Sequence, residues 1–334
     1  MKILLTGGAG FIGSNFIRTY LADHPEGEII NLDALTYAGN LENLKDIEGD
    51  SRYKFVHGSI TDRDLVFSLV DTVDAVVHFA AESHVDRSIM DASDFVETNV
   101  HGTQVLLDAA VDRGNKRFHH VSTDEVFGSL GPDDAPFDEN TPYAPRNPYS
   151  ASKAASDHLV RAYYHTHGLP ITISNCSNNY GPYHFPEKMI PLFISNIQEG
   201  KKVPVYGDGQ QIRDWIYVED HARGVAACLE KGVMGETYLF GDDQEMKNLD
   251  LTKKLIELLG ASDDLIEFVK DRPGHDSRYA TDSSKARREL GWAPQVTFDE
   301  GLVKTIAWFK ENQDWVERCR SGAYREYYKE QYGA

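Results

Sequence analysis

One stretch near the amino terminus restricts the fold more than any other part of this 334-residue chain. An apolar run, Ile3–Thr6, leads into a turn with glycines at 7, 8, 10 and 13, and an amphipathic segment, Ile12–Ala22, follows. Such a turn needs glycine because its backbone takes special angles and must approach a pyrophosphate closely. The first N–H groups of the following helix then point at the phosphates. Strand, turn and helix together predict the first unit of a dinucleotide-binding α/β fold.

The alternation of strand and helix continues through the first 175 residues. Short apolar, β-branched runs predict strands buried on both faces, and amphipathic stretches predict the helices between them. The expected strands are Ile3–Thr6, Ile29–Leu32, Phe55–His57, Ala75–Phe79, Phe118–Val121 and Ile171–Ser174, and the expected helices are Ile12–Ala22, Asp62–Val70, Phe95–Asp112 and Tyr149–His167. Because βαβ units are right-handed and place their strands in parallel, we expect a Rossmann-type doubly wound parallel sheet.

The alternation ends after residue 175. Segment 176–190 is rich in Asn, Gly and Pro and predicts a long irregular connection. Strand-like and helical pieces then mix, and the expected elements are Val203–Tyr206, Val218–Leu229, Thr237–Phe240, Leu249–Leu259, Ser283–Leu290 and Phe298–Asn312. A docked terminal helix is expected at Tyr324–Tyr332. We therefore predict a cofactor domain at 1–178, with returning segments from about 207–232, and a smaller, discontinuous mixed α/β substrate domain within 179–334.

Composition excludes several classes of partner. The chain has 34 Lys and Arg against 53 Asp and Glu, a net charge of −19, which repels nucleic acid and anionic membranes. No apolar run is long enough to span a membrane, and the first residues do not resemble a signal peptide. Three scattered cysteines, Cys176, Cys228 and Cys319, predict neither disulfides nor a zinc site. We expect reduced thiols, a cytoplasmic protein and no metal.

An acidic residue stands where the ribose of the cofactor is expected. Asp33 ends the second expected strand, 20 residues after Gly13. A carboxylate there accepts hydrogen bonds from the ribose hydroxyls and repels a 2′-phosphate, so NAD is favoured over NADP. The alternative, an ordinary turn aspartate, is weakened by the fingerprint that precedes it.

A tyrosine and a lysine provide a first candidate for proton transfer. Tyr149 and Lys153 lie four residues apart on one face of an expected helix. A free tyrosine has a pKa near 10, and a neighbouring cation favours the phenolate, so Tyr149 is expected to act as a base near neutral pH. About one such pair is expected by chance, so its weight comes from the dinucleotide fingerprint upstream.

Two strand ends add further candidates, because ligands bind at the carboxyl ends of parallel strands. The strand Phe118–Val121 leads to Thr123, Asp124 and Glu125. Two adjacent carboxyls suit separate proton donor and acceptor roles, although a helix-capping role is equally compatible with the local sequence. The end of the strand Ala75–Phe79 supplies small residues where a cofactor must lie close.

Taken together, these motifs resemble the extended short-chain dehydrogenases/reductases, and most closely the dTDP-glucose 4,6-dehydratases. The resemblance spans essentially the whole chain and lies in the strings GGAGFIGSNF, HFAAESHVDRSI, STDEVFG, PYSASKAASDHLV, CSNNYGPYHFPEKMIP, IRDWIYVEDHARG and DRPGHDSRYA. The fingerprint and Tyr-x-x-x-Lys mark only the superfamily, whereas the Thr-Asp-Glu triplet and the SNNYGP string are narrower. Small departures occur: Phe127 stands where Tyr is common, Ser59 where Asp is common, and Gly241-Asp242 where Gly-Gly is usual.

The resemblance implies a three-step reaction on dTDP-glucose that feeds deoxysugar synthesis such as that of rhamnose. Tyr149, supported by Lys153, takes the 4-hydroxyl proton while the C4 hydride passes to NAD. Glu125 then removes the C5 proton and Asp124 protonates the departing 6-hydroxyl, with Thr123 hydrogen-bonded near C4. The hydride returns to C6, which gives the 4-keto-6-deoxy sugar.

The resemblance also implies the binding residues and a homodimer. The expected NAD contacts are Gly7, Gly10, Phe11, Ile12, Gly13, Asp33, Thr36, Ser59, Ile60, Ala80, Ala81, Ser83, Thr98, Tyr149, Lys153 and Asn179. The expected substrate contacts are Ser83, His84, Thr123, Asn178, Lys188, Met189, Pro204, Tyr206, Arg213, Asn248, Arg272 and His275. An ion pair with Asp214 or Glu219 is the alternative for Arg213, and a turn histidine is the alternative for His275. The dimer is expected to form through Phe95–Asp112 and Tyr149–His167.

Other functions remain open at this point. A 4-epimerase of the same superfamily lacks the Asp-Glu pair as a rule. A dehydratase for a UDP-sugar is harder to separate, because thymine differs from uracil by one methyl, worth about 1 kcal/mol. A non-catalytic NAD sensor is disfavoured because all five catalytic side chains are present.

Overall fold

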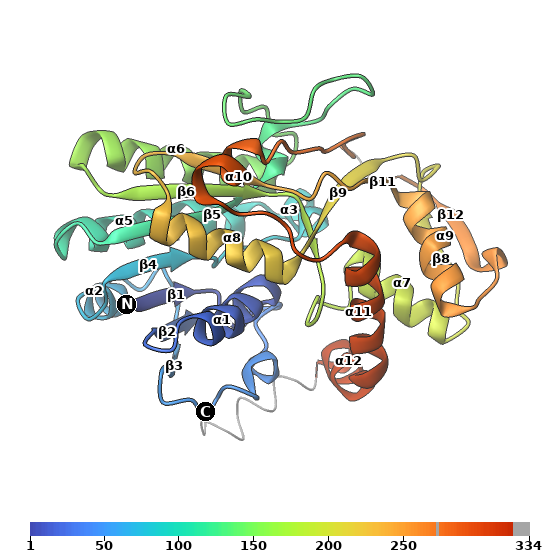
Figure 1. Cartoon of the computed structure of the whole chain (residues 1–334), viewed down its shortest axis with the longest axis horizontal. Helices are drawn as coiled ribbons and strands as arrows, with labels where there is room; N and C mark the ends of the chain where they lie inside the picture. The colour runs from blue at the N-terminus through green and yellow to red at the C-terminus, as the bar shows by residue number, and fades with distance from the viewer. Residues whose placement is uncertain (272–273, 323–334) are drawn as a thin grey trace.

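The computed structural model describes residues 1–271 and 274–322. Arg272 and the expected terminal helix Tyr324–Tyr332 therefore lie outside the described residues. The molecule has a large sheet domain at one end and a smaller mixed region at the other (Figure 1). None of the described helices is long and apolar enough to cross a membrane.

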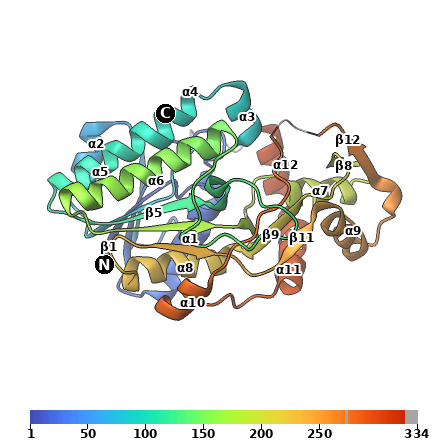
Figure 2. The same ribbon diagram turned by 90° about the horizontal axis from the view of Figure 1, so that it is seen from above.

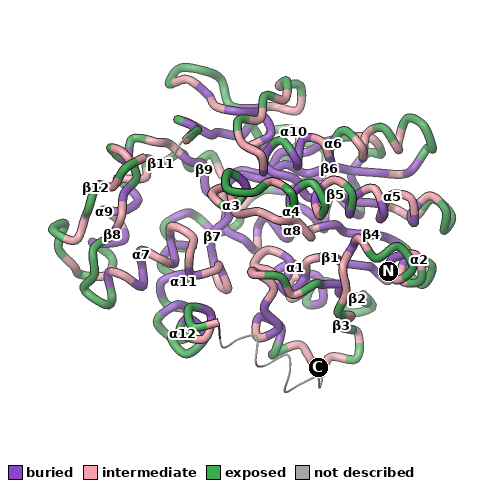
Figure 3. The backbone as a smooth tube through the Cα atoms, turned by 180° about the vertical axis from the view of Figure 1, so that it is seen from behind, coloured by how far each residue is buried: buried purple, intermediate pink, exposed green. Residues whose placement is uncertain are grey.

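A seven-stranded sheet forms the centre of the molecule, in the order β10-β6-β5-β4-β1-β2-β3 with every pair parallel. Its strands are β1 (Lys2–Thr6), β2 (Glu28–Asp33), β3 (Tyr53–His57), β4 (Ala75–His78), β5 (Arg117–Thr123), β6 (Ile171–Cys176) and β10 (Thr237–Phe240). The central strands are buried on both faces, which explains their continuous apolar sequences (Figure 3). The doubly wound parallel sheet predicted from the alternation is confirmed.

Helices cover both faces of this sheet (Figure 2). One layer contains α2 (Arg63–Val70), α5 (Thr103–Asp112) and α6 (Pro148–His167), and the other contains α1 (Phe11–Asp23), α8 (Val218–Lys231) and α10 (Ser284–Leu290). Alternate residues of one strand serve the two layers: Leu4 packs in the α5 core, whereas Ile3 and Leu5 pack in the α1 and α8 core. The carboxyl ends of the strands are thereby fixed relative to both layers.

The expected continuous helix Phe95–Asp112 is interrupted. A short α4 (Ser93–Phe95) leads into a π-helical segment, η2 (Val96–Gly102), before α5 begins at Thr103. The carbonyl of Asn99 accepts hydrogen bonds from the hydroxyls of Thr103 and Ser156, so side chains take up an acceptor that a regular helix would use. Periodicity alone does not reveal such a widened turn, and π-helical turns are frequent at functional sites.

The smaller region is built from segments after residue 176. It contains α7 (Met189–Gln198), α9 (Asn248–Leu259), α11 (Phe298–Glu311), α12 (Gln313–Ser321), the pair β8 (Val203–Tyr206) with β12 (Ile266–Val269), and the sheet β11 (Glu245–Lys247), β9 (Ile212–Tyr217), β7 (Asn178–Tyr180). The remaining short elements are η1 (Leu41–Leu44), α3 (Val85–Met90), η3 (Asp124–Phe127) and η4 (Asp263–Leu265). The apolar core of the smaller region contains side chains of α7, α9 and α11.

Two expectations about this region need correction. Segment 176–190 is not wholly irregular, because β7 lies within it and pairs with β9. The returning part of the chain also extends beyond residue 232, since β10 joins the main sheet beside β6 and α10 packs on that side. Both strands are only three or four residues long, so their pairing depends on distant partners that local sequence does not reveal. The domain boundary at residue 178 itself stays a prediction.

Candidate active site

The glycine-rich turn joins β1 to α1 and presents bare backbone. Gly7 has a φ of +75°, and a Cβ there would lie 2.7 Å from the Cα of Ala80. A Cβ on Gly13 would overlap the carbonyl of Gly7. Gly10 occupies the N-cap position of α1, whose first turn carries no acidic residue, so the positive end of the helix dipole faces the turn uncompensated. This cradle fits the diphosphate of a dinucleotide, which needs close backbone approach and N–H donors.

Asp33 at the end of β2 binds the glycine-rich turn directly. Its Oδ2 accepts the backbone N–H of Ala9 and its Oδ1 that of Leu35, each at 2.8 Å. The side chain is 8% exposed. Burial raises the pKa of Asp33, and the two N–H groups act in the opposite direction. The carboxyl therefore has a structural task besides the ribose contact predicted for it.

The residues expected near the adenine surround the ends of β2 and β3. Thr36 is exposed, Ser59 is half-buried, and Ile60 is buried against Gly102. The Ser59 hydroxyl lies 2.8 Å from that of Thr61 and accepts its backbone N–H, so it stabilises its own turn. The backbone N–H of Gly58, the residue before Ser59, donates to the Asp33 carbonyl, so this turn lies next to Asp33.

The loop after β4 is fixed by a residue that sequence analysis missed. Asn99 of η2 accepts the N–H of Glu82 at 2.8 Å, donates to its carbonyl at 3.0 Å, and donates to the hydroxyl of Ser152 at 2.8 Å. It thus ties the loop that carries Ala80, Ala81 and Ser83 to helix α6. Thr98 precedes it on the same π-helical segment. Asn99 had no signal in the sequence beyond its position within an expected helix.

The first turn of α1 faces the segment after β7. The ring of Phe11 stacks on His184 at 4.3 Å, while Ile12 follows on the same turn. Asn179 of β7 donates to the Ser177 carbonyl at 3.0 Å, and its Oδ1 lies 2.9 Å from Nδ1 of His221. Its predicted contact with the nicotinamide side stays a prediction.

The Thr-Asp-Glu triplet lies at the carboxyl end of β5. Thr123 caps the short η3 turn and accepts the N–H of Glu125 at 3.3 Å, so the cap is the threonine and not the pair of carboxyls. Asp124 is 2% exposed, and its Oδ2 has no hydrogen-bond partner among the described residues. Burial first, and then the charges of Glu125 and Asp214, raise the pKa of Asp124 well above its usual range. Burial therefore favours the protonated form of Asp124, beside a more accessible Glu125.

Tyr149 and Lys153 lie on α6, which an Asn147 cap and Pro148 start at this strand end. The ammonium of Lys153 donates to the Val121 carbonyl at 2.8 Å. The expected lowering of the tyrosine pKa is wrong for the free protein: burial, followed by the charge of Glu125, raises the pKa of Tyr149 well above 10. Burial likewise lowers the pKa of Lys153. Sequence spacing shows the pair but not the desolvation of the buried phenol, which raises its pKa.

Arg213 on β9 faces the same acids. Its guanidinium donates to the carbonyls of Ile212 and Asp276 and lies 4.3 Å from the ring centroid of Tyr279. Its positive charge lowers the pKa of Asp124 against the larger effect of burial. Tyr279 was not among the predicted residues, although it stands in the string DRPGHDSRYA. Burial, and then the charge of Glu125, raise the pKa of Tyr279. Burial raises the pKa of the adjacent Asp214 to about 7.

A second group of predicted residues meets where the β4 loop contacts α7. His84 Nε2 lies 3.3 Å from Glu187, a residue the sequence interpretation missed. Burial, and then the charge of Lys188, lower the pKa of His84. Lys188 is the N-cap residue of α7, and Met189 begins that helix. These side chains bring the sheet domain and the smaller region together beside Ser83.

The remaining predicted substrate residues lie on β7, β8 and α9 and in the segment between β12 and α10. Asn178 on β7 and Asn248 at the start of α9 each have a buried side-chain oxygen without a hydrogen-bond partner among the described residues. Buried amides are normally paired, so these oxygens fit donors on a ligand. Pro204 and Tyr206 belong to β8, and the ring of Tyr206 lies edge-on to His275 at 6.2 Å. His275 is paired with Asp271 at 2.6 Å, as the alternative of a satisfied turn histidine requires.

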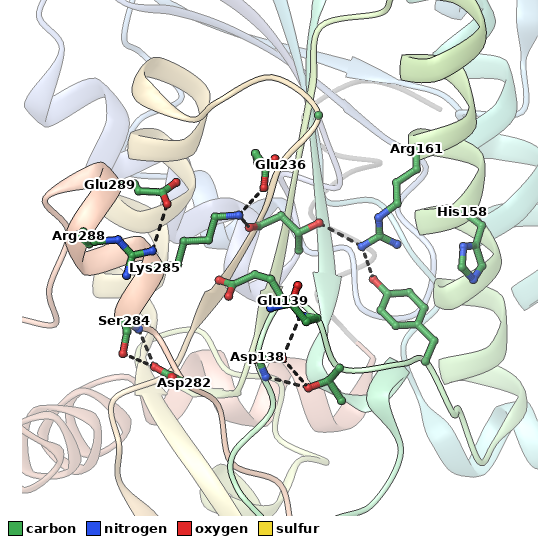
Figure 4. Close-up of a pocket in the computed structure, with 15 residues that line it drawn as sticks. Asp138, Glu139, His158, Arg161, Glu236, Asp282, Ser284, Lys285, Arg288 and Glu289 are labelled. Carbon is green, nitrogen blue, oxygen red and sulfur yellow. Dashed lines mark hydrogen bonds and ion pairs between the residues drawn. The ribbon is translucent and has the colours of Figure 1, made fainter.

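A pocket of about 760 Å³ lies on a different part of the surface (Figure 4). Its lining contains none of the predicted site residues. Lys285 is paired with Glu236, and Arg161 donates to hydroxyls of Tyr143 and Thr237. Lys285 and Arg161 thus have partners within the protein, and the lining shares no residue with the predicted site. This pocket is therefore not the candidate site.

Comparison with known proteins identifies relatives over nearly the full chain. The family model described as GDP-mannose 4,6 dehydratase matches residues 4–305. A dTDP-glucose 4,6-dehydratase of Escherichia coli is 51% identical, with 97% of this chain and 98% of the relative covered. The crystal structure of the dTDP-glucose 4,6-dehydratase of Streptomyces venezuelae with NAD bound is 52% identical, with a TM-score of 0.93 over 96% of this chain and 100% of that chain. A UDP-glucose 4-epimerase of Thermotoga maritima reaches a TM-score of 0.87 at 29% identity, with 94% and 100% covered.

Proposed function

The chain belongs to the GDP-mannose 4,6-dehydratase family, and we propose that it is an NAD-dependent hydro-lyase that converts dTDP-glucose to dTDP-4-keto-6-deoxyglucose. The observation that carries this proposal is the pair Asp124 and Glu125 at the end of β5. One carboxyl is buried and has a raised pKa, and its neighbour is more accessible. Elimination of water needs one acid and one base, and this pair supplies both.

The first step needs a base for the sugar 4-hydroxyl. Bound NAD⁺ supplies the hydride acceptor and a positively charged ring, which by Coulomb attraction favours a phenolate. Tyr149 takes the hydroxyl proton on its phenolate oxygen, and the hydroxyl of Thr123 lies within its hydrogen-bonding range. Lys153, held on the Val121 carbonyl, contributes a positive charge on the same helix face.

The second step is elimination across C5 and C6. The 4-ketone makes the C5 proton acidic, and Glu125 accepts that proton. Asp124 donates its proton to the 6-hydroxyl, which leaves as water. The raised pKa of Asp124 favours the protonated form that can supply this proton. The same hydride then returns to C6 while a proton returns to C5, so no net oxidation occurs.

Finer assignments are part of the proposal. The ribose edge at Asp33 selects NAD, and the orphan oxygens of Asn178 and Asn248 accept donors of the substrate. Three buried thiols, none of them in a disulfide, support a cytoplasmic location. The proposed product would feed deoxysugar synthesis such as that of rhamnose. A homodimer through α5 and α6 is supported by Met90 and Val96, which are 85% and 56% exposed beside those helices.

The test is incubation of the purified protein with dTDP-glucose and, separately, with UDP-glucose, followed by mass analysis. We expect loss of one water from dTDP-glucose, with UDP-glucose turned over more slowly. An isomer of unchanged mass would indicate a 4-epimerase, whose fold the chain shares. Faster turnover of UDP-glucose would move the protein to the uridine-nucleotide dehydratases.

A further inference from the structure

Asp157 is a fully buried carboxylate one helical turn after Lys153, and the reaction described above does not use it. Its Oδ2 accepts the hydroxyls of Ser122 at 2.9 Å and Tyr143 at 2.8 Å. Its Oδ1 lies 3.1 Å from Nε2 of His120. A buried charge of this kind is costly unless an opposite charge compensates it.

Lys153 and Asp157 hold consecutive residues of one strand. The ammonium of Lys153 bonds to the Val121 carbonyl, and Asp157 bonds to the next residue, Ser122. Because residues four apart share a helix face, the two side chains point at the same strand from the same side. Together they fix α6, and with it Tyr149, against the end of β5, where Asp124 lies.

Each of these two groups favours the charged form of the other. Burial lowers the pKa of Lys153, and the negative charge of Asp157 is the first influence that opposes this. The pKa of Asp157 is lowered by contact with His120 and by the charge of Lys153, against burial. Two histidines face the two side chains: the pKa of His78 lies well below 6.5 and that of His120 is about 4. The pKa of Cys176 is raised to about 12, and the pKa of Tyr143 is also raised. The remaining charged group is Arg161, which lines the pocket of Figure 4.

We propose that Asp157 is a positioning residue for the proposed reaction: it is the buried counter-charge that keeps Lys153 charged and held against β5. Asp157 touches neither substrate nor cofactor and acts through Lys153. The inference rests on the proposed function only for the rate effects, because the pairing itself is a property of the folded chain.

A thermal double-mutant cycle tests the pairing without activity. Lys153→Met leaves Asp157 buried without its counter-charge, so we expect a lower Tm. Lys153→Met combined with Asp157→Asn removes both charges, so its Tm should exceed that of Lys153→Met alone. Additive losses of Tm in the double variant would overturn the proposal, whatever the enzyme's substrate.

Rapid mixing of the NAD-loaded enzyme with dTDP-glucose tests the consequence for hydride transfer. Asp157→Asn should slow NADH formation with little change in KM. The ratio of its rate to the wild-type rate should approach one at low pH and fall as pH rises, since Lys153 without its counter-charge loses its proton at lower pH. A one-unit fall in that pKa lowers the charged fraction about tenfold above both values.

Tyr143→Phe is the matched control. It removes a hydrogen bond to Asp157 but leaves the charge, so its rate ratio should stay flat with pH. In the Lys153→Met background, Asp157→Asn should slow hydride transfer no further. A pH-independent loss in Asp157→Asn, or an equal slope in Tyr143→Phe, would show that the network only supports packing. A stable pair in the thermal cycle without any hydride-transfer activity would instead contradict the proposed function.

Discussion

The ends of β2 and β5 both carry a buried aspartate, yet the two carboxyls are held differently. Both oxygens of Asp33 accept backbone N–H groups, from Ala9 and Leu35. Asp124 has one oxygen without a partner among the described residues, and its neighbours Glu125 and Asp214 are acids. The first arrangement fixes the carboxyl in the glycine-rich turn, and the second favours a protonated carboxyl.

The same contrast extends to the regions around them. The cofactor side is mostly backbone, with glycines and helix termini that interact with a ligand of fixed charge. The catalytic side gathers titratable side chains from β5, α6 and β9, and burial moves the pKa of several of them. Changes on the catalytic side should therefore alter rates, whereas changes at Asp33 should alter affinity and stability.

The largest effect is expected for Tyr149→Phe, which keeps the ring and removes the oxygen that takes the sugar proton. Hydride transfer should be abolished, while substrate binding is largely retained. Absorbance of enzyme-bound NADH after rapid mixing with dTDP-glucose measures the step directly. Near wild-type reduction of NAD⁺ in this variant would mean that another group is the base.

Glu125→Gln separates oxidation from elimination. Loss of the base should slow dehydration by about 10²–10⁴-fold, while NADH still forms on mixing because Tyr149 and Lys153 are intact. The variant should also stop exchanging the C5 proton with deuterated solvent. Normal C5 exchange would contradict the assignment of Glu125 as the base.

Asp124→Asn should slow water loss by about 10²-fold while C5 exchange persists, since Glu125 is still present. In the wild type the acid form of Asp124 is required, and its pKa is raised. The rate of water loss should therefore fall as pH rises through that raised pKa, and the fall should disappear in Asp124→Asn. Single-turnover water loss, measured against pH in the wild type and in Asp124→Asn, tests this expectation. Glu125→Gln is the matched control, because it keeps the acid.

The sequence predicted more of the site at the end of β2 than of the site at the end of β5. The glycine turn and Asp33 follow from local rules of spacing, as do the strands of the sheet. At β5 the sequence placed Thr123, Asp124 and Glu125 at a strand end, but the raised pKa values of Asp124 and Tyr149 arise from burial by distant segments. Tyr279, Glu187, Asn99 and Asp157 were missed for the same reason, because their partners are far away in the chain. The epimerase of similar fold shows further that the fold does not select the reaction.

A smaller effect is expected for Asp33→Ala, measured by titration with NAD and NADP. NAD affinity should fall by roughly ten- to a hundredfold, as lost charge-assisted hydrogen bonds imply, and the preference over NADP should narrow. Serine in place of the neighbouring Thr36, which keeps a hydroxyl at an exposed position, is the matched control and should leave the preference unchanged. Equal wild-type affinity for both cofactors would remove the ribose role from Asp33.

The smallest effect is on stability, and it should have opposite signs at the two aspartates. In the folded protein the pKa of Asp124 lies above its unfolded value, so stability falls as pH rises from the unfolded pKa toward the folded one. At pH 7 the neutral Asn of Asp124→Asn avoids that cost and should raise Tm by a few degrees. Burial also raises the pKa of Asp33, so loss of its charge by itself favours a higher Tm. In Asp33→Asn, however, the amide NH₂ must face the N–H of Ala9 or Leu35, donor against donor; we expect this cost of about 1–3 kcal/mol to dominate and lower Tm. Thermal unfolding of both variants at pH 7 measures the two changes together. Shifts of the same sign would mean that the carboxyls at β2 and β5 do not differ in the way their hydrogen bonds indicate.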